Sequence, residues 1–115
     1  MIEIDKFAND SANSLNKMRR EILEVSTNAK EGHIPSAFSI LEILYTLYGA
    51  PILKNSQKKS SNMNDRLIFS KGHGSLALYA VLAEVGLIKH KEFYSFCKFD
   101  SICGGHPDKT KNKHF

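Results

Sequence analysis

The chain has 115 residues, of which 42% are hydrophobic, and a formal net charge of +4. This length accommodates one domain, and the apolar fraction is too high for a disordered chain. No apolar run approaches the roughly 20 residues of a membrane-spanning helix, and the N-terminus lacks a signal-peptide pattern. The two cysteines, Cys97 and Cys103, favour a reduced protein over a disulfide scaffold. We therefore expect a cytoplasmic protein without a membrane partner.

The positive charge alone is compatible with a nucleic-acid-binding protein. Lysines cluster in two polar stretches, residues 54–65 and 109–113, and no aromatic residues that could stack on bases are interleaved with them. Solvated loops account for this pattern, and we expect no nucleic-acid partner. A small basic nucleic-acid- or zinc-binding protein remains an alternative.

The first periodic segment predicts an amphipathic helix that ends near residue 29. Ser11 or Asn13 could cap its start, and Gly32 is suitably placed to end it. The spacing of three and four residues marks one apolar face. The residues on that face are Leu15, Met18, Ile22, Val25 and Ala29.

A second helix is expected over residues 37–48, after Pro35. Ser36 could cap it, and Ser39 with Glu42 has the spacing of a capping box. Apolar residues cover almost its whole circumference, which is typical of a helix buried on most sides. In so short a chain this predicts excess apolar surface and a protein partner. The residues expected to be exposed in the isolated chain are Ile40, Leu44 and Leu47.

Residues 66–70 are a short apolar run bounded by turn chemistry, and we predict a buried strand there. The turn Gly72-His73-Gly74 follows, and then a helix from Ser75 to about Val85 that ends at Gly86. A strand, a glycine-containing turn and a helix together place ligands at the carboxyl end of the strand. The pattern predicts an α/β fold that is rich in helices and has few parallel strands.

A last helix is expected over residues 89–99, with Cys97 on its apolar side. Cys97, Cys103, His106 and His114 could suggest a zinc site. Their spacing contains no Cys-x-x-Cys pair, and a buried free thiol is the commoner state for Cys97. We therefore assign no metal ligands.

Three of the five histidines directly follow a glycine: His33, His73 and His106. Glycine lets the backbone approach a ligand closely, and imidazole exchanges protons near neutral pH. The three residues make functional sense together only if the fold gathers them. Local alternatives are a helix-end residue for His33, a turn hydrogen bond for His73 and an exposed loop position for His106.

Three motifs, in the same order, resemble conserved blocks of transketolases. They are Glu31-Gly32-His33-Ile34-Pro35-Ser36, the run from Asp65 through Lys71-Gly72-His73-Gly74-Ser75 to Tyr79, and Gly105-His106-Pro107. The likeness covers about residues 13–108 and is closest to the separate amino-terminal subunits of split transketolases. It implies thiamine diphosphate as cofactor, a carboxyl-terminal transketolase subunit or a second copy as partner, and sugar-phosphate substrates in carbohydrate metabolism, either in the pentose phosphate pathway or in a specialised sugar pathway.

The resemblance also implies a role for each histidine. His33 and His106 match catalytic histidines that contact the sugar substrate, and His73 matches a cofactor-binding histidine beside the diphosphate. Ketol transfer requires proton donors around developing alkoxides, a requirement that histidines can meet. Groups that contact one cofactor–substrate complex should lie within about 10–15 Å of one another.

One part of the family pattern is absent from these 115 residues. Transketolases hold a magnesium ion at the cofactor's diphosphate through a Gly-Asp-Gly motif and a later asparagine, and this chain contains no such motif. We therefore expect residues 1–115 to be a single partial domain, the truncated amino-terminal part of a transketolase domain, and to be inactive alone. The alternative is a non-catalytic module that pairs with another subunit.

Overall fold

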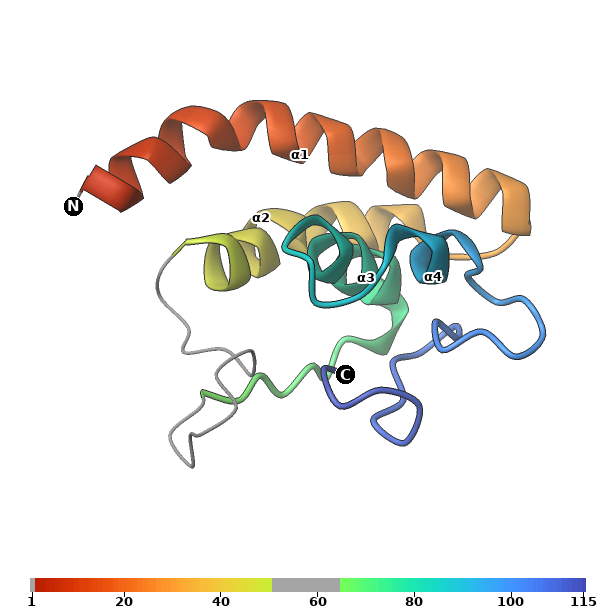
Figure 1. The fold of residues 1–115 in the computed structure, drawn as a ribbon. Coiled ribbons are helices and arrows are strands. Elements are labelled where there is room, and N and C mark those ends of the chain that lie inside the picture. Colours follow the sequence, from red (N-terminus) through yellow and green to blue (C-terminus); the bar gives the residue numbers. More distant parts are fainter. Residues whose placement is uncertain (1, 51–64) are drawn as a thin grey trace.

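The computed structural model describes residues 2–50 and 65–115. Over these residues the elements are, in order, α1 (Ile2–Ala29), α2 (Ile34–Gly49), the 3₁₀ turn η1 (Gly72–Gly74), α3 (Ser75–Glu84) and α4 (His90–Tyr94). Figure 1 shows α1 running along one side of the molecule, across α2, α3 and α4. The chain ends beneath these helices, where the ring of Phe115 packs against Tyr79 of α3, with 5.1 Å between centroids. The expected richness in helices is confirmed.

Helix α1 begins earlier than its apolar stripe indicated. It contains 28 residues, and Ser11 lies inside it, where its hydroxyl donates to the Ala8 carbonyl oxygen instead of capping the helix. The extension is stabilised by Phe7, whose ring lies 4.9 Å from that of Tyr45 of α2. Packing against α2 therefore continues the helix beyond its sequence signal.

The C-terminal end of α1 is a Schellman motif made without glycine. Lys30 adopts φ 56°, its amide donates to Thr27, and the amide of Glu31 donates to Ser26, both at 3.3 Å. Gly32, expected to end the helix, comes two residues later with φ 110° and turns the chain towards α2. The helix stop was therefore assigned to the wrong residue, although a glycine is still required at position 32.

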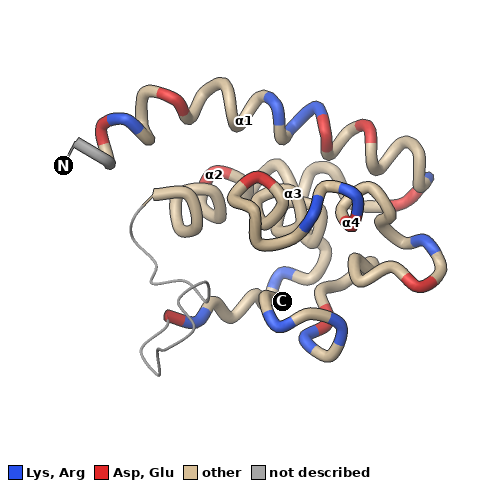
Figure 2. Tube along the Cα trace, viewed as in Figure 1, with Lys and Arg blue, Asp and Glu red and all other residues tan. Residues whose placement is uncertain are grey.

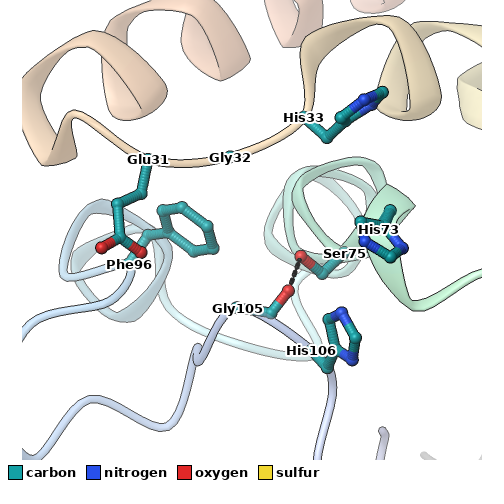
Figure 3. A pocket seen from close by; sticks show the side chains of 8 residues that line it. All are labelled: Glu31, Gly32, His33, His73, Ser75, Phe96, Gly105 and His106. Atoms are coloured by element: carbon teal, nitrogen blue, oxygen red, sulfur yellow. Dashed lines mark hydrogen bonds between the residues drawn. The ribbon is translucent and has the colours of Figure 1, made fainter.

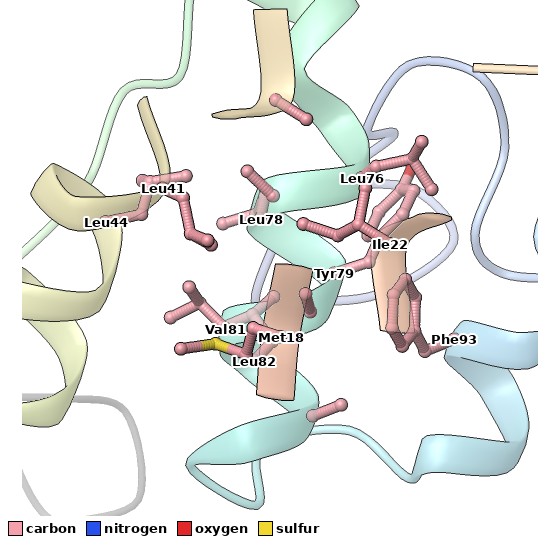
Figure 4. Close-up of a cluster of buried hydrophobic side chains, with 14 of the residues drawn as sticks. Met18, Ile22, Leu41, Leu44, Leu76, Leu78, Tyr79, Val81, Leu82 and Phe93 are labelled. Carbon is pink, nitrogen blue, oxygen red and sulfur yellow. The ribbon is translucent and has the colours of Figure 1, made fainter. Parts of the chain in front are cut away.

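Helix α3 is the centre of the molecule. Every residue from Ser75 to Ala83 is buried, because apolar side chains cover its whole surface and α1, α2 and α4 pack around it. Figure 4 shows Met18 of α1, Leu41 of α2 and Phe93 of α4 among the side chains that surround it. The expected end at Gly86 is confirmed: its φ is 83°, and the next amide, that of Leu87, donates to Leu82 at 2.8 Å.

Helix α2 is buried on only one side, contrary to its sequence pattern. Leu44, expected to be exposed, is 1% exposed, whereas Ile43 is 60% exposed. Ile40 and Leu47 are half-buried. The prediction for Leu44 was wrong because α3 supplies the partner that this face of α2 needs.

The expected strand at residues 66–70 is not formed, and no strand occurs among the residues that the structure describes. The side chains still alternate: Leu67 and Phe69 are half-buried, and Ile68 is 91% exposed. A strand is defined by backbone hydrogen bonds to a neighbouring strand. An alternating segment without such a neighbour in the described part of the chain remains irregular.

The expected helix over 89–99 is also shorter than predicted. Helix α4 ends at Tyr94, and Cys97 and Asp100 adopt φ 60° and 64°, which no α-helix accommodates. The chain turns back so that the Cys97 amide donates to the carbonyl oxygen of Cys103 at 2.9 Å. Bringing Cys103 into the core therefore interrupts the helix.

Charges are spread over the surface. Figure 2 shows acidic and basic residues interspersed along α1, and mostly basic residues in the C-terminal segment. Within the described ranges, no helix combines the length and apolarity that crossing a membrane requires.

Candidate functional site

Three separate segments meet beside the N-terminal end of α3. They are the connection between α1 and α2, the turn η1 with the first residue of α3, and the loop after Cys103 (Figure 3). Together with Phe96 they line a cavity of about 300 Å³, within the size range of small-molecule sites. The residues that line it are Glu31, Gly32, His33, His73, Ser75, Phe96, Gly105 and His106.

The fold brings the three glycine-preceded histidines together. The ring centroids of His33 and His73 are 5.9 Å apart, and those of His73 and His106 are 5.1 Å apart, both in edge-to-face arrangement. His73 therefore lies between the other two. The expectation that they share one cleft is confirmed.

His33 is positioned by the start of α2. It is the N-cap residue, and its Nδ1 accepts a hydrogen bond from the Ser36 amide at 3.3 Å. Neither Ser36 nor Ser39 caps the helix, contrary to the sequence prediction; the Ser39 hydroxyl donates to the Ser36 carbonyl oxygen. A nitrogen that accepts a hydrogen bond carries no proton, so neutral His33 has its proton on Nε2 and can donate it to a ligand.

His73 sits in η1 because two glycines allow close packing there. A Cβ on Gly72 would lie 3.0 Å from the His106 ring, and a Cβ on Gly74 would lie 3.3 Å from Ile40. The Gly74 amide closes the turn by donating to Lys71 at 2.9 Å. Glycine therefore lets the His106 imidazole lie directly against the backbone of η1.

His106 is held in place by hydroxyl groups of α3. Ser75 Oγ donates to the Gly105 carbonyl oxygen at 2.7 Å, and Tyr79 Oη donates to that of Gly104 at 2.6 Å. Burial, with a smaller contribution from Cys103, raises the pKa of Tyr79 far above its ordinary value, so the phenol stays protonated. The sequence interpretation missed both anchors, although their i, i+4 spacing places them on one face of α3.

Two further lining residues, Glu31 and Phe96, were also missed. Glu31 is exposed, and Figure 3 shows its carboxylate beside Phe96, away from the imidazoles.

Burial, and then the neighbouring Glu31 carboxylate, raise the pKa of Cys97 to about 11. Cys97 is thus a neutral thiol at physiological pH.

The alternative zinc set does not assemble. In the part of the chain that the structure describes, Cys97, Cys103, His106 and His114 do not bring three ligand atoms close enough together for one ion. Cys103 is completely buried, and burial raises its pKa to about 12. Both cysteines are free.

Comparison with known proteins identifies the family. Residues 11–114 match the transketolase thiamine diphosphate binding domain. The chain is 36% identical over 92 residues to transketolase of Homo sapiens, an alignment that covers 80% of this chain and 15% of that protein. It is 35% identical over 91 residues to one of the subunits of apulose-4-phosphate transketolase from Phocaeicola vulgatus, covering 79% of this chain and 32% of the relative.

A third relative is transketolase of Mycoplasma pneumoniae, 36% identical over 90 residues, with 78% of this chain and 14% of the relative covered. The chain thus spans between about one seventh and one third of the length of these relatives. No solved structure matches it significantly. The matched domain has an α/β fold, of which the described residues form a helix-rich part. The chain belongs to the transketolase family and corresponds to part of its thiamine diphosphate binding domain.

Proposed function

We propose that His33, His73 and His106 form part of the site at which a transketolase binds thiamine diphosphate and sugar phosphates. The observation that carries the proposal is their convergence, from three distant segments, on one cavity in a chain of this family. Residues 1–115 would then be one partial domain of a larger protein.

The chemistry of the cavity suits a phosphate-bearing ligand in part. Imidazole N–H groups can donate to phosphate or alkoxide oxygens, and Gly72 allows close approach of the backbone. Glu31 is the one carboxylate among the lining residues, and its charge opposes a diphosphate unless a cation intervenes. We propose that the magnesium ligands lie outside these residues.

The proposed roles follow from position. His73, between the other two rings, would contact the cofactor's diphosphate, and His33 and His106 would donate to oxygens of the sugar. His33 is suited to this because capping α2 leaves Nε2–H as its donor. The cofactor, when bound, supplies carbanion stabilisation for transfer of a two-carbon ketol unit. The protein's part is to hold donors where negative charge develops.

We also propose that the chain acts with another polypeptide, a carboxyl-terminal transketolase subunit or a second copy. The Phocaeicola vulgatus relative is by its name one subunit of a transketolase. Ile43, Ile68 and Phe99 are 60%, 91% and 96% exposed, which is costly for an isolated chain. The free cysteines suit the reducing cytoplasm, the compartment that we propose.

Titration of the 115-residue chain with thiamine diphosphate, followed by NMR of the five histidine rings, tests the site. We expect weak binding because the magnesium motif is absent, with the His73 signal shifting most and that of His90, outside the cavity, unchanged. His73→Gln should abolish the remaining shifts. A shift centred on His90 would contradict the proposed site.

Calorimetry and light scattering test the expectation that the chain is incomplete on its own. We expect no micromolar, magnesium-dependent binding and no ketol transfer, and we expect self-association through the exposed apolar residues. Tight magnesium-dependent binding by a monodisperse monomer would show that these residues suffice.

A further inference from the structure

A second group of ligand-type side chains lies at the opposite end of α3. Glu21 comes from α1, Glu84 is the last residue of α3, and His90 is the first residue of α4. One ligand atom from each lies within 4.8 Å of the others. We propose that these three residues bind a divalent cation, with Zn²⁺ as the probe. The site is independent of the proposed transketolase function.

The geometry is close to that of a metal centre. His90 Nε2 lies 3.5 Å from Glu21 Oε2. Ligands about 2.0–2.1 Å from a tetrahedral zinc ion are roughly 3.3 Å apart, so this pair needs almost no movement. Two carboxylates and an imidazole are a ligand set that zinc accepts, and a water molecule can complete the coordination. Glu84 supplies the third ligand atom, within 4.8 Å of the other two.

Glu21 provides an independent indication that something is bound here. The residue is 9% exposed, and its Oε1 is fully buried without a hydrogen-bond partner. Leaving a buried carboxylate oxygen without a hydrogen-bond partner destabilises the folded protein. A cation bound by both carboxylate oxygens of Glu21, Oε1 as well as the Oε2 that faces His90, would satisfy it.

Lys17 competes for this position in the metal-free protein. Its Nζ lies 2.9 Å from Glu84 Oε1, and its side chain is 49% exposed, so it can swing into solvent when a metal arrives. The His90 side chain is 46% exposed and provides a route of entry. Metal binding should therefore exchange the Lys17–Glu84 pair for a metal–Glu84 bond.

The site is separate from the histidine cavity. Helix α3 has ten residues and is therefore about 15 Å long, with Ser75 at the cavity end and Glu84 at the carboxylate end. Substitutions at His90 and at His73 can thus distinguish metal binding at the carboxylate end from metal binding in the histidine cavity. His73 is the residue substituted to test the cavity.

Calorimetric titration of the 115-residue chain with ZnCl₂, and absorption spectroscopy with Co²⁺, test the proposal. We expect one ion per chain with micromolar affinity. Glu21→Gln and His90→Gln should each weaken binding about tenfold or more, since even residues outside the coordination shell have effects of 10–100-fold. Lys17→Met should strengthen binding because it removes the competing cation. His73→Gln and His114→Gln should leave the affinity unchanged.

Folding of each variant is checked by circular dichroism. His90 is half-exposed, so H90Q keeps the test valid even if E21Q destabilises the helix packing. Unchanged zinc affinity in H90Q, or weakening in H73Q instead, would overturn the proposal, as would the absence of micromolar binding in the unmodified chain.

Discussion

The two ends of α3 differ in the side chains that gather around them. At its N-terminal end, buried hydroxyl groups of Ser75 and Tyr79 hold a loop by its carbonyl oxygens, and exposed imidazoles line a cavity. At its C-terminal end, Glu84 meets Lys17 and Glu21 of α1 and His90 of α4. Between them the helix is apolar and buried. The middle of the helix therefore carries no polar groups of functional interest. Its role is to hold in place the segments whose polar side chains gather at its two ends.

We expect the largest loss of stability from a substitution in the buried middle of α3, because both ends of the helix depend on it. Leu78→Ala should lower the free energy of unfolding by about 3 kcal/mol, because Leu78 is 1% exposed and its truncation leaves a cavity. Chemical denaturation measures this. Leu23→Ala is the matched control: that leucine is 46% exposed, and its change should stay within about 0.5 kcal/mol. Equal effects would show that α3 does not support the fold.

Substitutions at two glycines, one near each end of α3, allow a direct comparison of the ends. Gly32, at the cavity, has φ 110°, and a Cβ there would lie 2.5 Å from Leu76 Cδ1, whereas Gly86, after the other end, has φ 83° and open space around it. Gly32→Ala should cost about 2–3 kcal/mol from backbone strain and overpacking. Gly86→Ala should cost about 1 kcal/mol from strain alone. Thermal unfolding of both variants checks the order, and a larger cost at Gly86 would contradict it.

Removing the hydroxyl group of Tyr79 should affect the N-terminal end of α3 and not its C-terminal end. Tyr79→Phe removes the donor to Gly104 and should cost about 1 kcal/mol, while leaving the ring packing intact. NMR signals of the His106 ring should broaden or shift, and those of His90 should not. If both signals change equally, the loop is not held by this hydrogen bond.

The last prediction has no effect at neutral pH and appears only at alkaline pH. The pKa of Cys97 is raised to about 11 and that of Cys103 to about 12, from an ordinary value of 9.0. A raised pKa in the folded state gives stability below pH 9 that is lost as pH rises towards these values, because the unfolded chain ionises first. The free energy of unfolding should therefore decline from about pH 9 upwards. The double variant C97A/C103A should show a shallower decline, and an identical slope would rule out the thiols as its cause.

The difference between the ends also explains which residues the sequence analysis found. The cavity histidines each follow a glycine, so local motifs marked them before the fold was known. Glu21, Glu84 and His90 carry no motif, and nothing in the sequence around His90 distinguishes it from a solvated histidine. Their grouping acquires meaning only when α1 crosses the end of α3 and α4 turns back.

The errors share one cause. Residues 66–70 have strand-like alternation without a strand partner in the described chain, and Leu44 was expected to be exposed because its sequence pattern does not reveal that α3 covers it. Helix 89–99 was expected to continue through Cys97, which instead adopts a left-handed conformation. In each case the outcome depended on whether a distant segment packs against, or pairs with, the local one.

The sequence by itself determined which four regions contain helices, the stop at Gly86 and the family-type motifs around His33, His73 and His106. These depend on the period of apolar residues, on glycine chemistry and on local order, all of which can be read along the chain. Only the tertiary structure decided that His33 caps α2, that Ser75 and Tyr79 anchor the loop of His106, and that Glu21, Glu84 and His90 meet. Those contacts join residues on different elements, so they depend on how the helices pack around α3.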